Sequence, residues 1–261
     1  MKYIDSLGNN FLARMRDLGE WFFLMGAAIA RIPLPPYRLR QLLREVAEQG
    51  ANSFFIVAVA SFATGMVLAF QSGAILMRFG AEIYVARLVS LSMVRELGPV
   101  LGAIIFTGKA GSKMAAELGT MSVNEQILAT RAMALDPIEF LIKNRVLACI
   151  IAVPMLVVMA DFLGVFGGYI ICVHDIGTPP STYMNQIWES LYLKDFLSGM
   201  AKSVVFALLI ASICCYKGLK ASGGSEGVGR AVTEAVALSC IAVVLSDFVM
   251  TKFVVTFIDK M

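Results

Sequence analysis

The sequence is poor in the residues from which catalytic and metal sites are usually built. It contains a single histidine, His174, among 261 residues, and only 16% of the residues are charged. One imidazole cannot build a histidine-rich zinc site, and the H-E-x-x-H motif of zinc proteases is absent. A membrane-embedded enzyme would therefore lack obvious catalytic groups. We predict no catalytic residue, no metal site and no cofactor, and we interpret His174 as a solvated loop residue.

Nucleotide-binding and redox motifs are missing as well. A phosphate-binding loop needs the spacing G-x-x-x-x-G-K-[ST]. Neither the TGKAGSK run at 107–113 nor the glycine-rich stretch from Gly218 supplies it, so the chain by itself is not expected to hydrolyse ATP. Five cysteines occur without a C-x-x-C pair, and we favour small apolar packing residues over metal or redox groups. They are Cys149, Cys172, Cys214, Cys215 and Cys240.

What the sequence has in abundance is apolar length. Hydrophobic residues make up 58% of the chain, and the mean hydropathy is +0.77. A helix needs about 20 apolar residues to cross a bilayer, and five blocks reach that length: 54–77, 88–108, 146–173, 196–216 and 232–257. The sequence therefore predicts an all-α, polytopic integral membrane protein with five transmembrane helices.

The N-terminal segment predicts a helix of a different kind. Apolar residues recur there at helical spacing with charged residues mostly elsewhere, which is typical of a helix lying in the membrane interface. The apolar ones are Phe11, Met15, Leu18, Phe22, Met25 and Ile29. A cleaved signal peptide is the alternative, because WFFLMGAAIA resembles an apolar signal core, but Asp5, Asp17 and Glu20 argue against it.

Prolines divide this helix from the next. We expect Pro33, Pro35 and Pro36 to end it, and YRLRQLLREVAEQ to form a second amphipathic helix before the first span. On this basis the chain divides into an N-terminal part with interfacial or elbow helices, 1–50, and a five-span domain, 51–261.

Basic residues near the span ends predict the orientation. Most of them precede span one or lie between spans two and three and between spans four and five, and few lie on the other side. Because cytoplasmic loops carry an excess of lysine and arginine, we expect a cytoplasmic N-terminus, a cytoplasmic 109–145 segment and a C-terminus outside.

Four charged residues fall inside the predicted spans at a similar depth. Arg95 and Glu96 lie in span two, Lys202 in span four and Asp247 in span five, roughly 10–15 Å below the outer boundary at 1.5 Å per residue. Asp161 in span three lies deeper. Charges of both signs at one depth are costly in lipid. Two interpretations stay open: an ion-pair network that fixes helix packing, and a polar lining that receives a charged headgroup.

The segment between spans two and three predicts a short capped helix. Ser122-Val-Asn-Glu125 matches a capping box, and Asp136-Pro137 supplies a second helix start. The helix between them, 123–134, cannot span a bilayer. Its apolar side chains favour a helix that docks into a soluble partner, although an interfacial connector without a partner is the alternative. Those side chains are Met121, Ile127, Leu128 and Met133.

Several collinear motifs identify a family. Residues 95–148 contain RELGPVL, G-x-x-GS-x-x-AAELGTM-x-V-x-EQI, DP and RVLA, and residues 223–236 read GGSEGVGRAVTEAV. Over about residues 50–257 the chain resembles the MlaE family of ABC-transporter permeases, which take part in phospholipid transport between the inner and outer membranes of diderm bacteria.

The resemblance implies an assembly and two functional regions. Family members form a homodimer that works with two cytoplasmic ABC ATPase subunits, a periplasmic MCE-domain protein and a small STAS-type subunit. The intramembrane cluster Arg95, Glu96, Lys202 and Asp247 would bind phospholipid, and residues 117–129 would form the coupling helix. Its site residues would be Glu117, Gly119, Thr120, Ser122, Glu125, Gln126 and Ala129. Thr130-Arg131-Ala132 departs from the family pattern.

The expected function is therefore that of a transmembrane permease subunit in a bacterial inner membrane. It would move phospholipid with ATP hydrolysed by a partner, and it would bind no nucleic acid. The alternative is a secondary transporter driven by an ion gradient through Asp161, Asp247 and Glu96. That class often carries an internal repeat, and no convincing repeat crosses the five spans.

Overall fold

The computed structural model describes residues 2–32 and 39–258, with side chains described for residue 12 and for residues 15–32 and 39–256. Pro33, Pro35, Pro36 and Tyr37 lie outside these residues, as does the side chain of Phe11. The predicted proline stop is therefore not described. The described residues are almost entirely helical, as the sequence predicts.

Five helical segments of the described chain are long and apolar enough to cross a membrane. They confirm the five predicted spans. The first is α2 (Leu39–Leu76) followed by a 3-10 turn to Phe79. The second, Glu82–Val123, contains a 3-10 turn (η2, Glu82–Tyr84), α3 (Val85–Ser92), α4 (Gly98–Phe106) and α5 (Ser112–Val123). The third is a π-turn (η5, Ile138–Ile142) with α7 (Lys143–His174); the fourth is α9 (Leu193–Leu219); the fifth is α10 (Gly224–Phe253) with a final π-turn (η6, Val254–Ile258).

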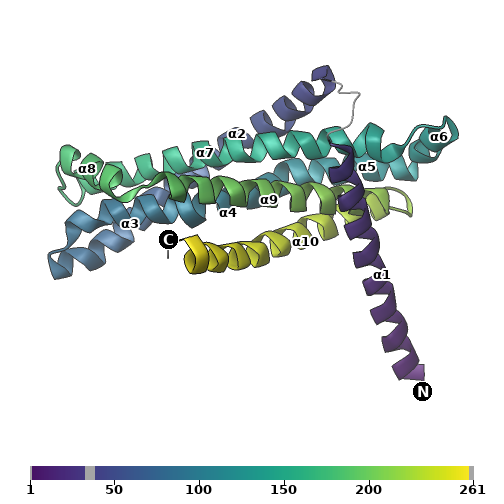
Figure 1. Ribbon diagram of the computed structural model, residues 1–261, viewed down its shortest axis with the longest axis horizontal. Coiled ribbons are helices and arrows are strands. Elements are labelled where there is room, and N and C mark those ends of the chain that lie inside the picture. The colour runs from purple at the N-terminus through teal and green to yellow at the C-terminus, as the bar shows by residue number, and fades with distance from the viewer. Residues whose placement is uncertain (1, 33–38, 259–261) are drawn as a thin grey trace.

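These helices run side by side along the long axis of the molecule (Figure 1). One end carries α6 (Gln126–Ala132) and the other carries α8 (Pro180–Ser190), and we call them the α6 end and the α8 end. The sequence did not indicate α8. It begins at a proline, which suits a first helical turn, and the Tyr183 hydroxyl fixes it by donating to the Val165 carbonyl at 2.9 Å.

Small residues bring α2 and α7 into close contact. A Cβ added to Gly65 would lie 1.8 Å from the Gly164 carbonyl oxygen, and one added to Gly167 would lie 2.3 Å from that of Phe62. Glycine at such crossings lets two backbones approach, which drives packing where lipid provides no hydrophobic force. α7 also packs against α4 and α9 and is the centre of the bundle.

The second span is not a uniform helix. It is interrupted by π-turns at Met93–Leu97 (η3) and Thr107–Gly111 (η4). Pro99 follows the first turn and has no N–H, so the carbonyl of Arg95, four residues earlier, cannot be used in the regular helix pattern. In a membrane such a carbonyl needs another donor, and the Lys202 side chain supplies one.

The first helix, α1 (Lys2–Arg31), leaves the bundle at a steep angle near the α6 end (Figure 1). Side-chain contacts made by Asp17, Glu20, Trp21 and Arg31 attach it to the bundle. Trp21 Nε1 donates to Ser212 Oγ at 3.1 Å, Lys220 Nζ lies 2.6 Å from carboxylates of both Asp17 and Glu20, and Arg31 contacts the 133–137 connection. The predicted helix is confirmed, and its position in the interface stays a prediction.

The proposed boundary between residues 50 and 51 falls inside α2, which continues through it without a break. The division into an N-terminal part and a five-span domain is an interpretation that the helix bounds do not mark.

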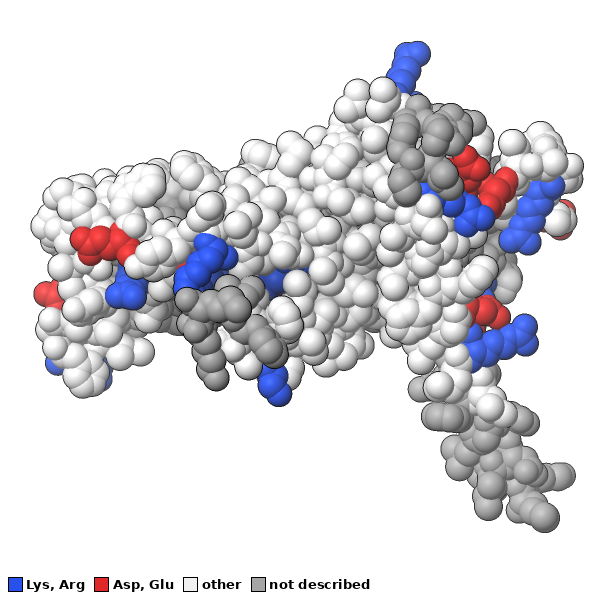
Figure 2. All heavy atoms as spheres, in the orientation of Figure 1, with Lys and Arg blue, Asp and Glu red and all other residues white. Residues whose placement is uncertain are grey.

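The surface reflects the spans. Charged side chains gather toward the two ends, with a broad uncharged region between them (Figure 2). α10 is the most open of the five spans, and its exposed side chains include Ile241, Leu245, Phe248 and Val249, each more than half exposed. So large an apolar face needs lipid or another apolar surface to cover it. Cys149, Cys172, Cys214 and Cys215 are buried, which agrees with their interpretation as packing residues.

Candidate functional site

Lys202 is the centre of an intramembrane cluster. Its side chain is 1% exposed, and its Nζ donates to Glu96 Oε2 at 2.7 Å, Thr251 Oγ1 at 2.7 Å and the Arg95 carbonyl at 2.9 Å. Asp247 Oδ1 lies 2.9 Å from the same nitrogen and forms an ion pair with it. The lysine cluster, formed by Glu96, Lys202, Asp247 and Thr251, joins η3, α9 and α10.

The depths predicted from the sequence placed Glu96, Lys202 and Asp247 together, as the structure does, but the prediction missed Thr251. The Thr251 hydroxyl lies 3.1 Å from both Glu96 oxygens, so it connects the carboxylate to the lysine. It lies four residues after Asp247, which puts both on one face of α10. A search for polar residues on that face, rather than for charges alone, could have found it.

The side chain of Arg95 has a different partner. Its Nε donates to Asp195 Oδ1 at 2.7 Å and its Nη2 also contacts that oxygen. Asp195 is 2% exposed, and its other oxygen accepts the Tyr192 backbone N–H at 2.9 Å as part of a capping box at the start of α9. The predicted four-residue cluster is thus two adjacent groups, joined through the backbone of Arg95.

Asp161 stays apart from both groups. It is 6% exposed, and a Cβ on Gly98 would lie 1.8 Å from its Oδ1. That oxygen has no hydrogen-bond partner in the part of the chain that the structure describes. The absence of a side chain at Gly98 is what leaves room for this carboxyl group beside the first π-turn.

The members of the lysine cluster differ in exposure. The Lys202 side chain is buried, whereas the side chains of Asp247 and Glu96 are 19% and 38% exposed. The charges sum to −1 when all three groups are ionised, because two carboxylates face one ammonium. The cluster can therefore fasten three helices and still offer acceptor oxygens at the surface of the bundle.

At the α6 end, the predicted capping box is wrong. α5 continues to Val123, so Ser122 lies in its last turn and its hydroxyl donates to the Leu219 carbonyl at 3.0 Å. Glu125 has a left-handed backbone (φ 57°) and makes no side-chain cap. The helix of the second span extends past the membrane segment, which leaves only Gln126–Ala132 for α6. The predicted helix 123–134 is therefore too long at both ends.

The second predicted cap is confirmed. Asp136 Oδ1 accepts the Ile138 backbone N–H at 2.9 Å, so the carboxylate caps the start of the third span. Its other oxygen accepts from Arg31 Nη2 at 2.6 Å, which attaches the end of α1 to the same connection.

The seven predicted coupling residues fall into two groups. Thr120, Glu125, Gln126 and Ala129 are exposed. Glu117, Gly119 and Ser122 make contacts within the chain: Glu117 with Arg145 at 2.8 Å, and Gly119 so close to Val228 that a Cβ would lie 3.2 Å away. Of the predicted apolar side chains, Leu128 and Met133 are 62% and 65% exposed. The free surface of α6 therefore combines polar and apolar groups.

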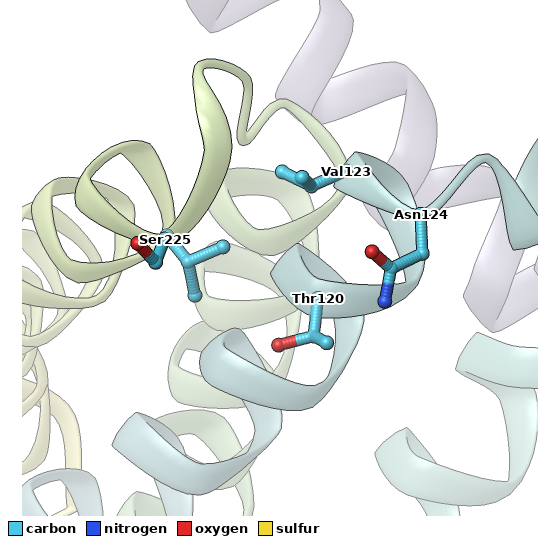
Figure 3. Close-up of a pocket in the computed structure, with 5 residues that line it drawn as sticks. Thr120, Val123, Asn124 and Ser225 are labelled. Carbon is cyan, nitrogen blue, oxygen red and sulfur yellow. The ribbon is translucent and has the colours of Figure 1, made fainter.

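A recess of about 220 Å³ lies beside α6, between the end of α5 and the start of α10 (Figure 3). Thr120, Val123, Asn124, Ser225 and Val228 line it. The letters Gly-Gly-Ser-Glu-Gly around Ser225 match the G-x-S-x-G spacing of hydrolase nucleophiles, but that motif requires a preceding strand. A helix, α9, precedes it here, and His174 is the last residue of α7, which leads into α8 at the other end of the bundle.

Comparison with known proteins places the chain in a family. The family model described as Permease MlaE matches residues 42–253. A probable ABC transporter permease protein of Rickettsia typhi is 37% identical over 94% of this chain and 95% of its own length. The intermembrane phospholipid transport system permease protein MlaE of Haemophilus influenzae is 31% identical over 96% and 97%.

A relative from a plant organelle extends the likeness. The chloroplastic protein trigalactosyldiacylglycerol 1 of Arabidopsis thaliana is 32% identical over 88% of this chain and 66% of its own length. The family model runs through the helices that carry the lysine cluster and α6. Five apolar helices and the family match together lead to one conclusion: the chain belongs to the MlaE family of ABC transporter permeases.

Proposed function

We propose that this chain is the membrane-spanning permease subunit of an ABC transporter that moves phospholipid between two membranes. A separate ATPase subunit supplies the energy, and the chain itself hydrolyses no ATP. The family match and the phospholipid-transport relative support this proposal. The observation that carries it is the shape of α6. This helix lies outside the bundle, is too short to cross a membrane, and exposes both polar and apolar side chains.

The rest of the assembly is proposed from the resemblance. Two copies of the chain pair within the bacterial inner membrane, with the N-terminus and α6 in the cytoplasm and the C-terminus in the periplasm. An ABC ATPase binds each α6, a periplasmic MCE-domain protein receives or delivers lipid, and a small STAS-type subunit accompanies the ATPases. The exposed apolar face of α10 is a surface that lipid or a second copy could cover.

The lysine cluster suggests how lipid is held. Phospholipid headgroups carry a phosphate, and some carry an ammonium. Glu96 is 38% exposed and offers carboxylate oxygens to a cationic group. The Arg95 guanidinium is 29% exposed beside Asp195, and its positive charge attracts phosphate. The acyl chains would lie against the apolar side chains of the neighbouring spans.

In the proposed mechanism, this chain passes the motion of the ATPase subunits from α6 to the membrane spans. ATP binding closes the paired ATPase subunits, the motion reaches α6, and α6 moves the ends of the second and third spans. The space between the two copies narrows and lipid passes to or from the MCE-domain protein. Interactions that hold α6 to the ATPase therefore control transport without contacting lipid.

The test uses the complete complex, purified with its ATPase subunit. Leu128→Glu is expected to reduce the amount of ATPase that purifies with the chain, because it puts a charge into an apolar contact. Leu43→Glu is the matched control: the same change at a leucine of α2 that is 67% exposed, against 62% for Leu128. Equal ATPase retention in both variants would remove the support that α6 gives to the proposal.

A further inference from the structure

α6 is attached to the bundle at its two ends. Among the described helices it packs substantially only against α5, which precedes it. After it, residues 133–137 lead directly into η5 and α7. A force applied to α6 therefore reaches the bundle through α5 on one side and through the start of the third span on the other.

An ion pair with one buried partner joins these two routes. Glu117 of α5 accepts from Arg145 Nη2 of α7 at 2.8 Å. The Arg145 side chain is 7% exposed, and its Nη1 also donates to the Leu141 carbonyl at 3.3 Å. Because one partner is removed from water, the attraction is screened less than that of a surface pair. The pair closes a loop that runs α5–α6–η5–α7.

The contacts continue to α2. Lys113, one turn before Glu117, lies 3.8 Å from that carboxylate and donates to Glu48 Oε2 at 2.8 Å. Glu48 accepts from Arg44 within α2 at 2.8 Å. The ion-pair brace, formed by Glu48, Lys113, Glu117 and Arg145, thus links the ends of the first three spans beside α6.

We propose that the brace makes these three span ends move together with α6, and that Glu117 and Arg145 are positioning residues for coupling. Glu117 then acts inside the permease and makes no contact with the ATPase. This inference rests on the proposed function, because it concerns how a motion delivered to α6 reaches the spans. Without the brace, α6 would displace α5 alone and part of each ATPase cycle would move no lipid.

The experiment measures coupling in the complete complex. Wild type, Glu117→Gln, Arg145→Lys and the double variant are reconstituted in vesicles of phosphatidylethanolamine and phosphatidylglycerol with a trace of fluorescent phosphatidylethanolamine. Lipid moved is divided by ATP hydrolysed. We expect each single variant to lower this ratio by roughly three-fold, and the double variant to be no worse than either, because both changes remove one interaction. Lysine keeps the charge at 145 but cannot reproduce the arginine fork.

The matched control is Lys217→Gln with Glu234→Gln. This pair also lies at the α6 end and also spans 2.8 Å, but it joins α9 to α10 and takes no part in the loop. We expect its ratio to equal that of the wild type. Thermal unfolding of every variant in detergent shows whether a fall in the ratio merely follows lost stability.

Three outcomes would overturn the inference. The ratio could stay at the wild-type value in both single variants, the two losses could add in the double variant, or Glu117→Gln could lose the ATPase subunit, which would place Glu117 in the ATPase contact. Failure of the proposed function looks different: wild type itself would then show no ATP-dependent lipid movement.

Discussion

Lys202 and Lys113 both hold helices together through pairs of carboxylates, yet their surroundings differ. The Lys202 side chain is 1% exposed and the Lys113 side chain is 44% exposed. The first has every donor used inside the bundle, so the loss of one partner leaves buried charge uncompensated. The second can turn to water when a partner leaves. The comparison separates contacts that hold the fold from contacts that can change during a transport cycle.

The largest loss of stability is expected for the buried lysine, Lys202. Lys202→Met leaves Glu96 and Asp247 facing each other without a cation, which should destabilise the chain by about 3 kcal/mol or more. Thermal unfolding in detergent measures it. The triple variant K202M/E96Q/D247N removes all three charges and should recover much of the loss. A K202M chain as stable as the wild type would mean that the lysine cluster does not hold the three spans.

A smaller loss is expected at Asp195. Asp195→Asn keeps an acceptor for the Tyr192 N–H but weakens the pair with Arg95, whose side chain is 29% exposed and can recover some hydration. We expect a loss of about 1.5 kcal/mol, measured in the same unfolding experiment. A loss of stability as large as that of K202M would show that the exposure of Arg95 does not reduce the cost of removing the Asp195 charge.

In the exposed region around α6, we expect backbone conformation to affect stability more than charge does. Glu125 lies in the left-handed region before α6, where an ordinary side chain costs about 1 kcal/mol, a β-branched one costs more and glycine costs nothing extra. Glu125→Val should therefore increase amide hydrogen exchange in α6, and Glu125→Gly should not. Equal exchange in both variants would mean that this turn does not position α6.

The smallest effect concerns the attachment of α1. Hydrogen bonds from Lys220 hold the pKa values of Asp17 and Glu20 below their ordinary values, with Arg16 adding to the effect on Glu20. Carboxylates with lowered pKa values stabilise the attached state at pH above their ordinary values, and that contribution is lost as the pH falls through the lowered ones. The attachment should thus be constant from neutral pH to about pH 5 and weaken below about pH 4.

Tryptophan fluorescence can follow this attachment. The chain has two tryptophans, so Trp188→Phe leaves Trp21, which contacts Ser212, as the only reporter. In that background Lys220→Gln should give at neutral pH the Trp21 signal that acid gives the parent. A signal that is independent of both pH and Lys220 would assign the attachment to Trp21 and Arg31 instead.

The sequence predicted those parts of the fold that depend on local pattern. Apolar length fixed the five spans, and the number of residues from each span end put Glu96, Lys202 and Asp247 at one depth. It failed at Ser122 and Glu125, because a capping box and the last turn of a longer helix can share the same letters. The preceding span decides between them, since an unbroken helix already occupies residue 122.

The family resemblance supplied a set of coupling residues, but not what each one contacts. Glu117 and Gln126 belong to the same motif, but Glu117 pairs with Arg145 within the chain, whereas Gln126 is exposed. The direction of each side chain around α5 depends on where Arg145 and Val228 lie, and these are far away in the chain. The roles of these residues in lipid binding and coupling remain predictions for the experiments above.

The sequence by itself thus determined a five-span membrane protein of the MlaE family, since apolar length and collinear motifs need no knowledge of contacts. Only the tertiary structure decided the partners: Asp195 for Arg95, Thr251 for Lys202 and Arg145 for Glu117. In these three pairs the two residues are separated by 28 to 100 positions. The physical reason is that helix formation is local, whereas a buried charge is satisfied by whichever group the packing of whole helices brings near it.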